Sequence, residues 1–172
     1  MCNNVDTLSE VEIITKELVK MLSESHLTIT TAESCTGGMI SSTIVNIPGT
    51  SSVLNEAYVT YANEAKMKIL GVKRDTLDVH GAVSEETAYE MVVGVAKAAQ
   101  ADCAIAVTGI AGPDGGTDDK PVGTVYAGFY YKGNVEVVRY NFDGDRYEVR
   151  SKTTRETLKK MIELIVKFEK KV

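Results

Sequence analysis

Segment 102–108 constrains the fold more strongly than any other part of this 172-residue chain. It reads Asp-Cys-Ala-Ile-Ala-Val-Thr, a near-continuous apolar run. Such a run is typical of a strand that is covered on both faces, as in a parallel sheet with helices on either side. The sequence therefore predicts an α/β fold.

Apolar periodicity and turn residues divide the rest of the chain into alternating helices and strands. Thr7 and Glu10 offer a capping box to the first helix, Gly71 ends the third, and Ser84 is a suitable N-cap for the fourth. The expected helices cover residues 11–22, 39–46, 63–70, 85–100 and 145–170. The expected strands cover residues 27–31, 56–61, 102–108, 122–131 and 135–142, the last two forming a hairpin.

This order of elements predicts a three-layer α/β/α sandwich with a mixed, largely parallel sheet and a closing C-terminal helix. We expect residues 1–172 to form a single domain, because no linker, repeat or low-complexity segment interrupts them. Ligands of such folds bind at the carboxyl ends of the strands. That rule selects the residues that follow Thr31, Tyr61 and Thr108.

Charge and cysteine content exclude several classes of protein. The formal net charge is −5, and the chain before residue 146 is strongly acidic, which argues against a duplex nucleic-acid partner. Only residues 146–172 are basic, with nine Lys and Arg against four Asp and Glu; a solvated helix face is the simpler interpretation. Three cysteines do not suggest a secreted disulfide framework. With no secretory signal or membrane span evident, we expect a cytoplasmic protein.

The residues after the first strand could hold an anion or an oxyanion. Ser34 and Cys35 lie on a short turn, and Gly37 and Gly38 then open a helix whose first N–H groups have no partner within the helix. The alternative is a tight turn without a ligand.

The segment after the second strand carries Tyr61 at the strand end and Lys66 near the first turn of the next helix. A lysine near a helix N-terminus is mildly disfavoured, which helps to lower its pKa, and a desolvated lysine can act as a general base. The alternative is an ordinary surface lysine.

The loop after the third strand, residues 109–120, is rich in glycine but matches neither common phosphate-binding pattern. Its acids Asp114, Asp118 and Asp119 could bind a cation, although surface acids are the simpler interpretation. His26 and His80 are too few and too scattered to indicate a zinc site. Cys35 with His80 as its base is a minor alternative for a nucleophile, and Cys103 is expected in the core.

Arg146 stands at the start of the last helix, where a cation is slightly disfavoured and an arginine is often aimed at an anion. Arg150, one turn later, could share that role. The alternative is an ion pair between Arg146 and a nearby acid such as Asp143.

Six motifs, in the same order, resemble those of the CinA C-terminal domain family. They are 31–38 (Thr-Ala-Glu-Ser-Cys-Thr-Gly-Gly), 59–66 (Val-Thr-Tyr-Ala-Asn-Glu-Ala-Lys), 80–84 (His-Gly-Ala-Val-Ser), 108–116 (Thr-Gly-Ile-Ala-Gly-Pro-Asp-Gly-Gly), 120–124 (Lys-Pro-Val-Gly-Thr) and 144–146 (Gly-Asp-Arg). The resemblance spans about Leu27 to Arg146 and extends through both terminal helices.

Characterised enzymes of that family are nicotinamide-nucleotide amidases. The resemblance implies a hydrolase of pyridine-nucleotide salvage that converts nicotinamide mononucleotide to nicotinic acid mononucleotide and ammonia. The family is similar to serine amidases that use a Ser–Lys pair. The resemblance therefore implies Ser34 as the nucleophile, Lys66 as its base and Tyr61 as a third catalytic residue. The substrate-binding residues it implies are Glu33, Thr36, Gly37, Gly38, Thr108, Gly109 and Arg146.

The resemblance also implies no cofactor and no metal, a mononucleotide as the small-molecule partner, no nucleic-acid or membrane partner, and a homodimer or higher homo-oligomer. Larger members carry a further N-terminal domain, which we do not expect here because only 26 residues precede the first strand. Two alternatives stay open: a non-catalytic nucleotide-binding or partner module, and a competence- or DNA-damage-associated factor that acts through the basic last helix.

Overall fold

The computed structural model describes residues 9–169. Its helices are α1 (Glu10–Glu24), α2 (Met39–Val45), α3 (Asn63–Leu70), α4 (Arg74–His80), α5 (Glu85–Ala99) and α6 (Arg146–Glu169). Its strands are β1 (Ile29–Glu33), β2 (Leu54–Val59), β3 (Cys103–Gly109), β4 (Thr124–Tyr131) and β5 (Asn134–Asn141), with a short 3-10 turn at Thr50–Ser52 before β2.

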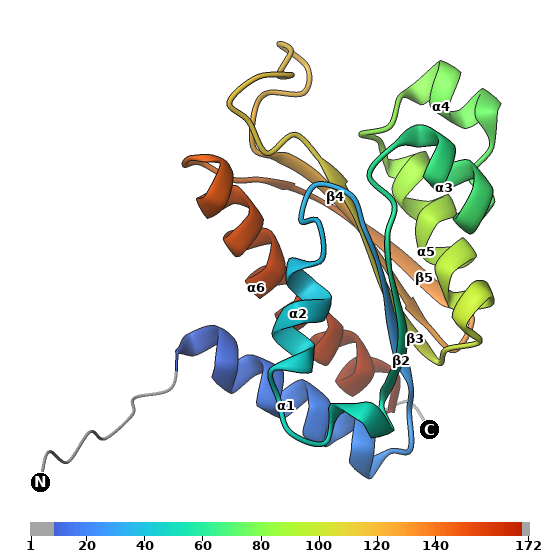
Figure 1. The fold of residues 1–172 in the computed structure, drawn as a ribbon, viewed down its shortest axis with the longest axis vertical. Coiled ribbons are helices and arrows are strands. Elements are labelled where there is room, and N and C mark those ends of the chain that lie inside the picture. Colours follow the sequence, from blue (N-terminus) through green and yellow to red (C-terminus); the bar gives the residue numbers. More distant parts are fainter. Residues whose placement is uncertain (1–8, 170–172) are drawn as a thin grey trace, which may run out of the picture.

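One sheet of order β2-β1-β3-β4-β5 forms the middle layer (Figure 1). Strands β2, β1 and β3 pair in parallel, and β4 pairs antiparallel with both β3 and β5. Helices α1, α2 and α6 cover one face, and α3, α4 and α5 cover the other (Figure 1). The predicted three-layer sandwich with a mixed sheet and a closing C-terminal helix is confirmed.

Each face of the sheet has its own apolar core. The core beneath α1, α2 and α6 includes Leu18, Ile40 and Leu158, whereas the core beneath α3, α4 and α5 includes Leu70 and Met91. Between them lies β3, which is buried along its length except at its last residue. The continuous apolar run therefore reflects burial on both faces, as predicted. No helix within residues 9–169 is long and apolar enough to cross a membrane.

The bounds of two strands differ from the expected ones by about two residues: β1 lies later in the chain than expected, and β2 lies earlier. Strand β1 is buried throughout, whereas β2 is mostly exposed. The first helix begins at Glu10, and the hydroxyl of Ser9 accepts a hydrogen bond from the Glu12 N–H. The predicted capping box at Thr7 is therefore wrong, and Thr7 itself lies outside the described residues. The short helix α4 was not predicted from the sequence.

Strand register aligns three loops at one edge of the sheet. Glu33 of β1 pairs with Val59 of β2 on one side and with Val107 of β3 on the other. The next residue of each strand segment, at positions 34, 60 and 108, therefore stands at the same carboxyl edge. The residues that follow β1, β2 and β3, which the sequence predicted to form the site, therefore lie at one edge of the sheet.

A close helix contact fixes α3 against α5. Gly94 of α5 faces the last turn of α3, and a Cβ at this position would lie 1.9 Å from the Leu70 carbonyl oxygen. Only a glycine lets the two backbones approach so closely. Since Lys66 lies on α3 one turn before Leu70, this contact also sets the position of Lys66 above the sheet.

We expect Gly94→Ala to lower the free energy of unfolding by about 1–3 kcal/mol, because the added methyl group forces the two helices apart. Urea unfolding followed by circular dichroism measures it. Lys97→Ala, at an exposed position of the same helix, is the matched control and should change stability by less than about 0.5 kcal/mol. Equal stability of Gly94→Ala and the wild type would contradict the close contact.

Candidate active site

The side chains of Ser34 and Lys66 meet at the carboxyl edge of the sheet. Lys66 Nζ lies 3.1 Å from Ser34 Oγ, although 32 positions separate the residues in the chain. Ser34 follows β1 directly, and Lys66 lies on α3, which packs on the α5 side of the sheet. The structure therefore brings together the hydroxyl and the amine that the sequence singled out separately.

Lys66 is a buried lysine, only 1% exposed. Its Nζ also contacts the carbonyl oxygens of Thr60 at 3.1 Å and Tyr61 at 3.0 Å, both in the turn that precedes α3. Burial lowers the pKa of the Lys66 amine from its ordinary value of 10.5, because a low-dielectric environment disfavours the charged form. The interpretation of Lys66 as a surface lysine is thus wrong.

Glu33, the last residue of β1, has the opposite orientation and a different role. It is completely buried, and its carboxylate accepts hydrogen bonds from the N–H groups of Gly38, Ile40 and Ser41 at 2.8–3.0 Å. The Thr36 hydroxyl also donates to it at 2.7 Å. Glu33 therefore caps the start of α2, where a carboxylate satisfies the orphan N–H groups of the helix.

Gly37 and Gly38, in the turn between β1 and α2 that carries Ser34, shape that turn. The N–H of Gly37 donates to the Ser34 carbonyl at 3.1 Å, and the N–H of Gly38 is held by Glu33. Both have positive φ angles, +61° and +95°, which suit glycine. These N–H groups, expected as oxyanion donors, are already engaged. Neither glycine, nor Glu33 or Thr36, is among the described residues that line the cavity beside Ser34.

That cavity, the inner cavity, has a volume of about 200 Å³. It is lined by Ser34, Cys35, Tyr61, Asn63, Lys66, Ala82, Val83, Thr108, Gly109, Ala111 and Arg146. The Thr108 hydroxyl donates to the carbonyl of Ala82 at 2.7 Å and so joins the end of β3 to the turn before α5. At Gly109 a Cβ would lie 2.7 Å from Val125 Cγ2, so a side chain there would collide with β4.

Tyr61 and Arg146 meet at the mouth of the inner cavity. Arg146 Nη2 donates to the Tyr61 hydroxyl at 3.1 Å, and its Nη1 donates to the Gly112 carbonyl at 2.8 Å. The Tyr61 side chain is 61% exposed, so it borders the entrance rather than the Ser34–Lys66 contact. Asp143 pairs with Lys152, not with Arg146, which makes the ion-pair alternative for Arg146 wrong.

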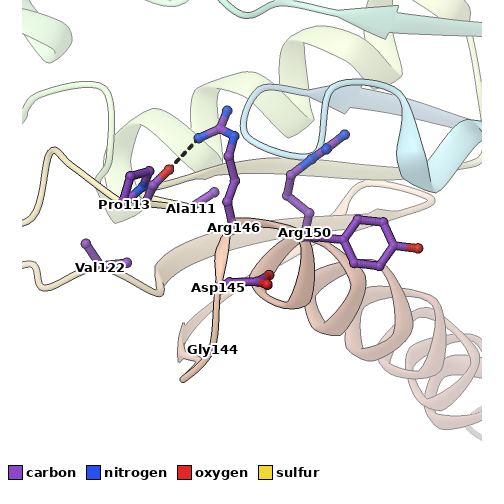
Figure 2. Close-up of a pocket in the computed structure, with 9 residues that line it drawn as sticks. Ala111, Pro113, Val122, Gly144, Asp145, Arg146 and Arg150 are labelled. Atoms are coloured by element: carbon purple, nitrogen blue, oxygen red, sulfur yellow. Dashed lines mark hydrogen bonds between the residues drawn. The ribbon is translucent and has the colours of Figure 1, made fainter.

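A second, larger cavity of about 650 Å³ adjoins the first and shares Ala111 and Arg146 with it. We call it the outer cavity (Figure 2). The loop around Pro113 lines it on one side, and the start of α6 with Asp145, Arg146 and Arg150 lines it on the other.

The Cys35–His80 pair is not assembled. Burial raises the pKa of the Cys35 thiol to about 12, so this thiol stays protonated near neutral pH. His80 lies on α4, where its Nδ1 is 3.2 Å from a Glu86 carboxylate oxygen. Within residues 9–169 no group of three or more His, Cys, Asp or Glu side chains could hold a metal ion.

Sequence reasoning missed several contributors to the site. The two carbonyl oxygens on Lys66 belong to the backbone, which residue types do not reveal. Thr60 has a fully buried hydroxyl without a hydrogen-bond partner in the described part of the chain. Asn63 and Val83 line the inner cavity although nothing in their spacing marks them.

Comparison with known proteins identifies the family of this chain. The profile of the CinA C-terminal domain matches residues 11–165. A relative from Clostridium perfringens strain SM101, described as competence-damage inducible, is 53% identical over 150 residues, which cover 87% of this chain and 36% of the relative. The chain thus spans little more than a third of the length of such curated relatives.

Solved structures are similar over nearly their whole length. The competence damage-inducible protein A of Klebsiella pneumoniae is 38% identical with a TM-score of 0.89, over 92% of this chain and 98% of that one. The competence/damage inducible protein of Agrobacterium tumefaciens is 40% identical with a TM-score of 0.88, over 91% of this chain and 96% of that one. The chain therefore belongs to the CinA C-terminal domain family.

Proposed function

We propose that this chain is an amidase that hydrolyses the carboxamide of nicotinamide mononucleotide to a carboxylate and ammonia. The observation that carries the proposal is the 3.1 Å contact between Ser34 Oγ and the buried Lys66 Nζ. The choice of nicotinamide mononucleotide is supported by the six family motifs quoted above and by the two adjoining cavities.

The surroundings of Lys66 direct its lone pair toward the serine. A neutral amine has two N–H groups and one lone pair. The carbonyl oxygens of Thr60 and Tyr61 accept hydrogen bonds but cannot donate them. They therefore take the two N–H groups, and the lone pair faces the Ser34 hydroxyl, which can donate its proton. The lowered pKa of Lys66 supplies the neutral amine that this step needs.

Hydrolysis then proceeds in two balanced steps. Ser34 Oγ attacks the carboxamide carbon while its proton passes to Lys66 Nζ. Lys66 returns that proton to the nitrogen as the C–N bond breaks, so ammonia leaves and an acyl ester remains on Ser34. A water molecule then attacks the ester, with Lys66 again accepting one proton and returning it to Ser34 Oγ. The product leaves as the carboxylic acid and loses its remaining proton to solvent or ammonia, which gives the carboxylate.

The developing oxyanion needs N–H donors that the turn has not already used. Besides Gly37 and Gly38, the N–H of Ser34 is also engaged, since it donates to the Val107 carbonyl at 3.0 Å. The N–H groups of Cys35 and Thr36 donate to no backbone carbonyl within residues 9–169. We assign the oxyanion to these two groups.

The test is release of ammonia from nicotinamide mononucleotide by the wild-type protein, with nicotinic acid mononucleotide quantified by chromatography. Stoichiometric formation of both products supports the proposal. Calorimetric binding of the mononucleotide without turnover would contradict it and favour the non-catalytic module instead. If the protein neither binds nor hydrolyses nicotinamide mononucleotide, this compound is ruled out as the substrate.

The pH profile tests the role of Lys66. Because the neutral amine is the active form, we expect kcat/KM to rise with pH and level off above the pKa of Lys66, which lies below 10.5. Initial rates of ammonia release between pH 5 and 10 measure this. A rate that falls as pH rises through this range would show that the protonated amine is the active form.

A further inference from the structure

The Thr60 hydroxyl is the only buried side-chain polar atom that has no hydrogen-bond partner within residues 9–169. Thr60 is completely buried, and the proposed mechanism uses only its carbonyl oxygen, which contacts Lys66. A buried hydroxyl without a partner destabilises a protein, because it has lost its contact with bulk water and gained no protein contact in exchange. What this hydroxyl contributes therefore needs a physical explanation.

Strand register places the Thr60 side chain beside that of Ser34. The Thr60 N–H donates to the Glu33 carbonyl at 2.9 Å, which continues the pairing of β1 and β2 one residue beyond Val59. Ser34 and Thr60 thus occupy neighbouring positions on adjacent strands, which lie about 4.8 Å apart. Glu33 and Val59, the residues before them, face the start of α2. Since side chains alternate along an extended chain, Ser34 and Thr60 both lie on the α3 side of the sheet.

The contacts of Lys66 agree with this placement. Its Nζ lies 3.1 Å from Ser34 Oγ and 3.1 Å from the Thr60 carbonyl oxygen, so the amine lies between the two neighbouring residues. Thr108 occupies the matching position after β3, on the other side of Ser34, but its hydroxyl donates to the Ala82 carbonyl at 2.7 Å. Of the two threonine hydroxyls that flank Ser34 in the sheet, only that of Thr60 has no partner in the described part of the chain.

The proposed reaction places negative charge on Ser34 Oγ. In the second step the bond between the acyl carbon and Oγ breaks, and its electron pair stays on Oγ until Lys66 returns a proton. A hydrogen bond donated to a charged oxygen is shorter and about twice as strong as one donated to a neutral oxygen. A donor beside Oγ that has no other partner to give up can therefore stabilise this charge without rearranging the site.

We propose that the Thr60 hydroxyl donates a hydrogen bond to Ser34 Oγ as that oxygen leaves the acyl ester. The proton of Thr60 stays on Thr60, and the proton that Ser34 regains comes from Lys66. The proposal rests on the proposed function for its acyl ester, but the departure of Ser34 Oγ can be tested without a carboxamide. Thr60 is not among the described residues that line the inner or the outer cavity, so it acts on the rate of the reaction and not on substrate binding.

The experiment measures how fast an acetyl group leaves Ser34. The activated ester para-nitrophenyl acetate acetylates a reactive serine directly, and mass spectrometry of quenched samples follows the loss of the acetyl group from Ser34. We expect Thr60→Val, which keeps the shape of the side chain but lacks the hydroxyl, to lose the acetyl group about 10- to 100-fold more slowly than the wild type. Thr60→Ser, which keeps the hydroxyl, should remain close to the wild type.

Two further measurements separate this role from a structural one. The urea midpoint of Thr60→Val should equal or exceed that of the wild type, because the substitution removes an unpartnered buried hydroxyl. Thr157→Val removes a completely buried hydroxyl that is hydrogen-bonded within α6; it is the matched control and should leave deacetylation unchanged. If the valine variant at position 60 does not fold, Thr60→Ala takes its place in the comparison with Thr60→Ser.

Equal rates of deacetylation in Thr60→Val and the wild type would overturn the proposal. Equal losses in Thr60→Val and Thr60→Ser would also overturn it, since they would show a requirement for packing rather than for the hydroxyl. The same holds if neither the wild type nor Thr60→Val carries an acetyl group on Ser34. If deacetylation depends on the Thr60 hydroxyl but the wild type does not hydrolyse nicotinamide mononucleotide, the role of Thr60 stands and the proposed function fails.

Discussion

Ser34→Ala should lower kcat for carboxamide hydrolysis by about three orders of magnitude or more, while the protein keeps its fold and still binds the mononucleotide. In the proposed mechanism the Ser34 oxygen forms the acyl ester, and a methyl group cannot replace it. Removing a nucleophile from a concerted unit typically costs this much. Single-turnover ammonia release measures the loss, and calorimetry verifies binding.

The same experiment can show whether Ser34 and Lys66 act as one unit. Lys66→Met, a change of similar shape, should cause a comparable loss, and the double variant should be no slower than either single variant. Ser42→Ala, an exposed serine on α2, is the matched control and should retain full activity. A wild-type rate of hydrolysis by Ser34→Ala would rule out Ser34 as the nucleophile. Additive losses of rate in the double variant would show that Ser34 and Lys66 act independently.

Glu33→Ala should lower the free energy of unfolding by about 3–5 kcal/mol. The carboxylate is completely buried and accepts hydrogen bonds from three backbone N–H groups and the Thr36 hydroxyl. Its removal leaves all of these donors unsatisfied in a dry site, a much larger penalty than the loss of an exposed helix cap. Urea unfolding followed by circular dichroism measures the change.

Two further variants sharpen this prediction. Glu33→Gln keeps one acceptor oxygen, so it should lose less stability than Glu33→Ala and provides a measurable protein if the alanine variant does not fold. Glu85→Ala removes an exposed carboxylate from the first turn of α5 and should cost at most about 1 kcal/mol. Similar losses at positions 33 and 85 would show that the buried hydrogen bonds of Glu33 contribute little.

The sequence was most informative where one interaction dominates locally. The run 102–108 predicted a doubly covered strand because burial on both faces selects apolar residues from Cys103 to Val107. Gly71 and Ser84 were assigned correctly as the end of α3 and the cap of α5, because left-handed backbone and N-cap geometry select those residues. Helix α4 was missed because a seven-residue amphipathic helix with one buried residue leaves little periodicity.

The sequence predicted which residue types the site contains, but not the directions in which their side chains point. Ser34 and Lys66 were singled out because each follows a strand that ends at the same edge. Whether Glu33 would face a ligand or a helix depends on side-chain alternation about an exact strand end, which the sequence did not predict. Likewise, the basic residues of α6 contact acids distant in the chain: Lys160 and Lys167 both pair with Glu136 of β5.

Glu33 and Ser34 are adjacent in the chain, yet the Glu33 carboxylate contacts α2 and the Ser34 hydroxyl contacts Lys66 of α3. These two helices lie on opposite sides of the sheet (Figure 1). A shift of β1 by a single position would exchange these two directions and bury the nucleophile beneath α2. Correct alignment of β1 between its two neighbouring strands is therefore a condition for the proposed catalysis as well as for folding. An insertion or deletion within this strand should abolish activity even where a packed core survives.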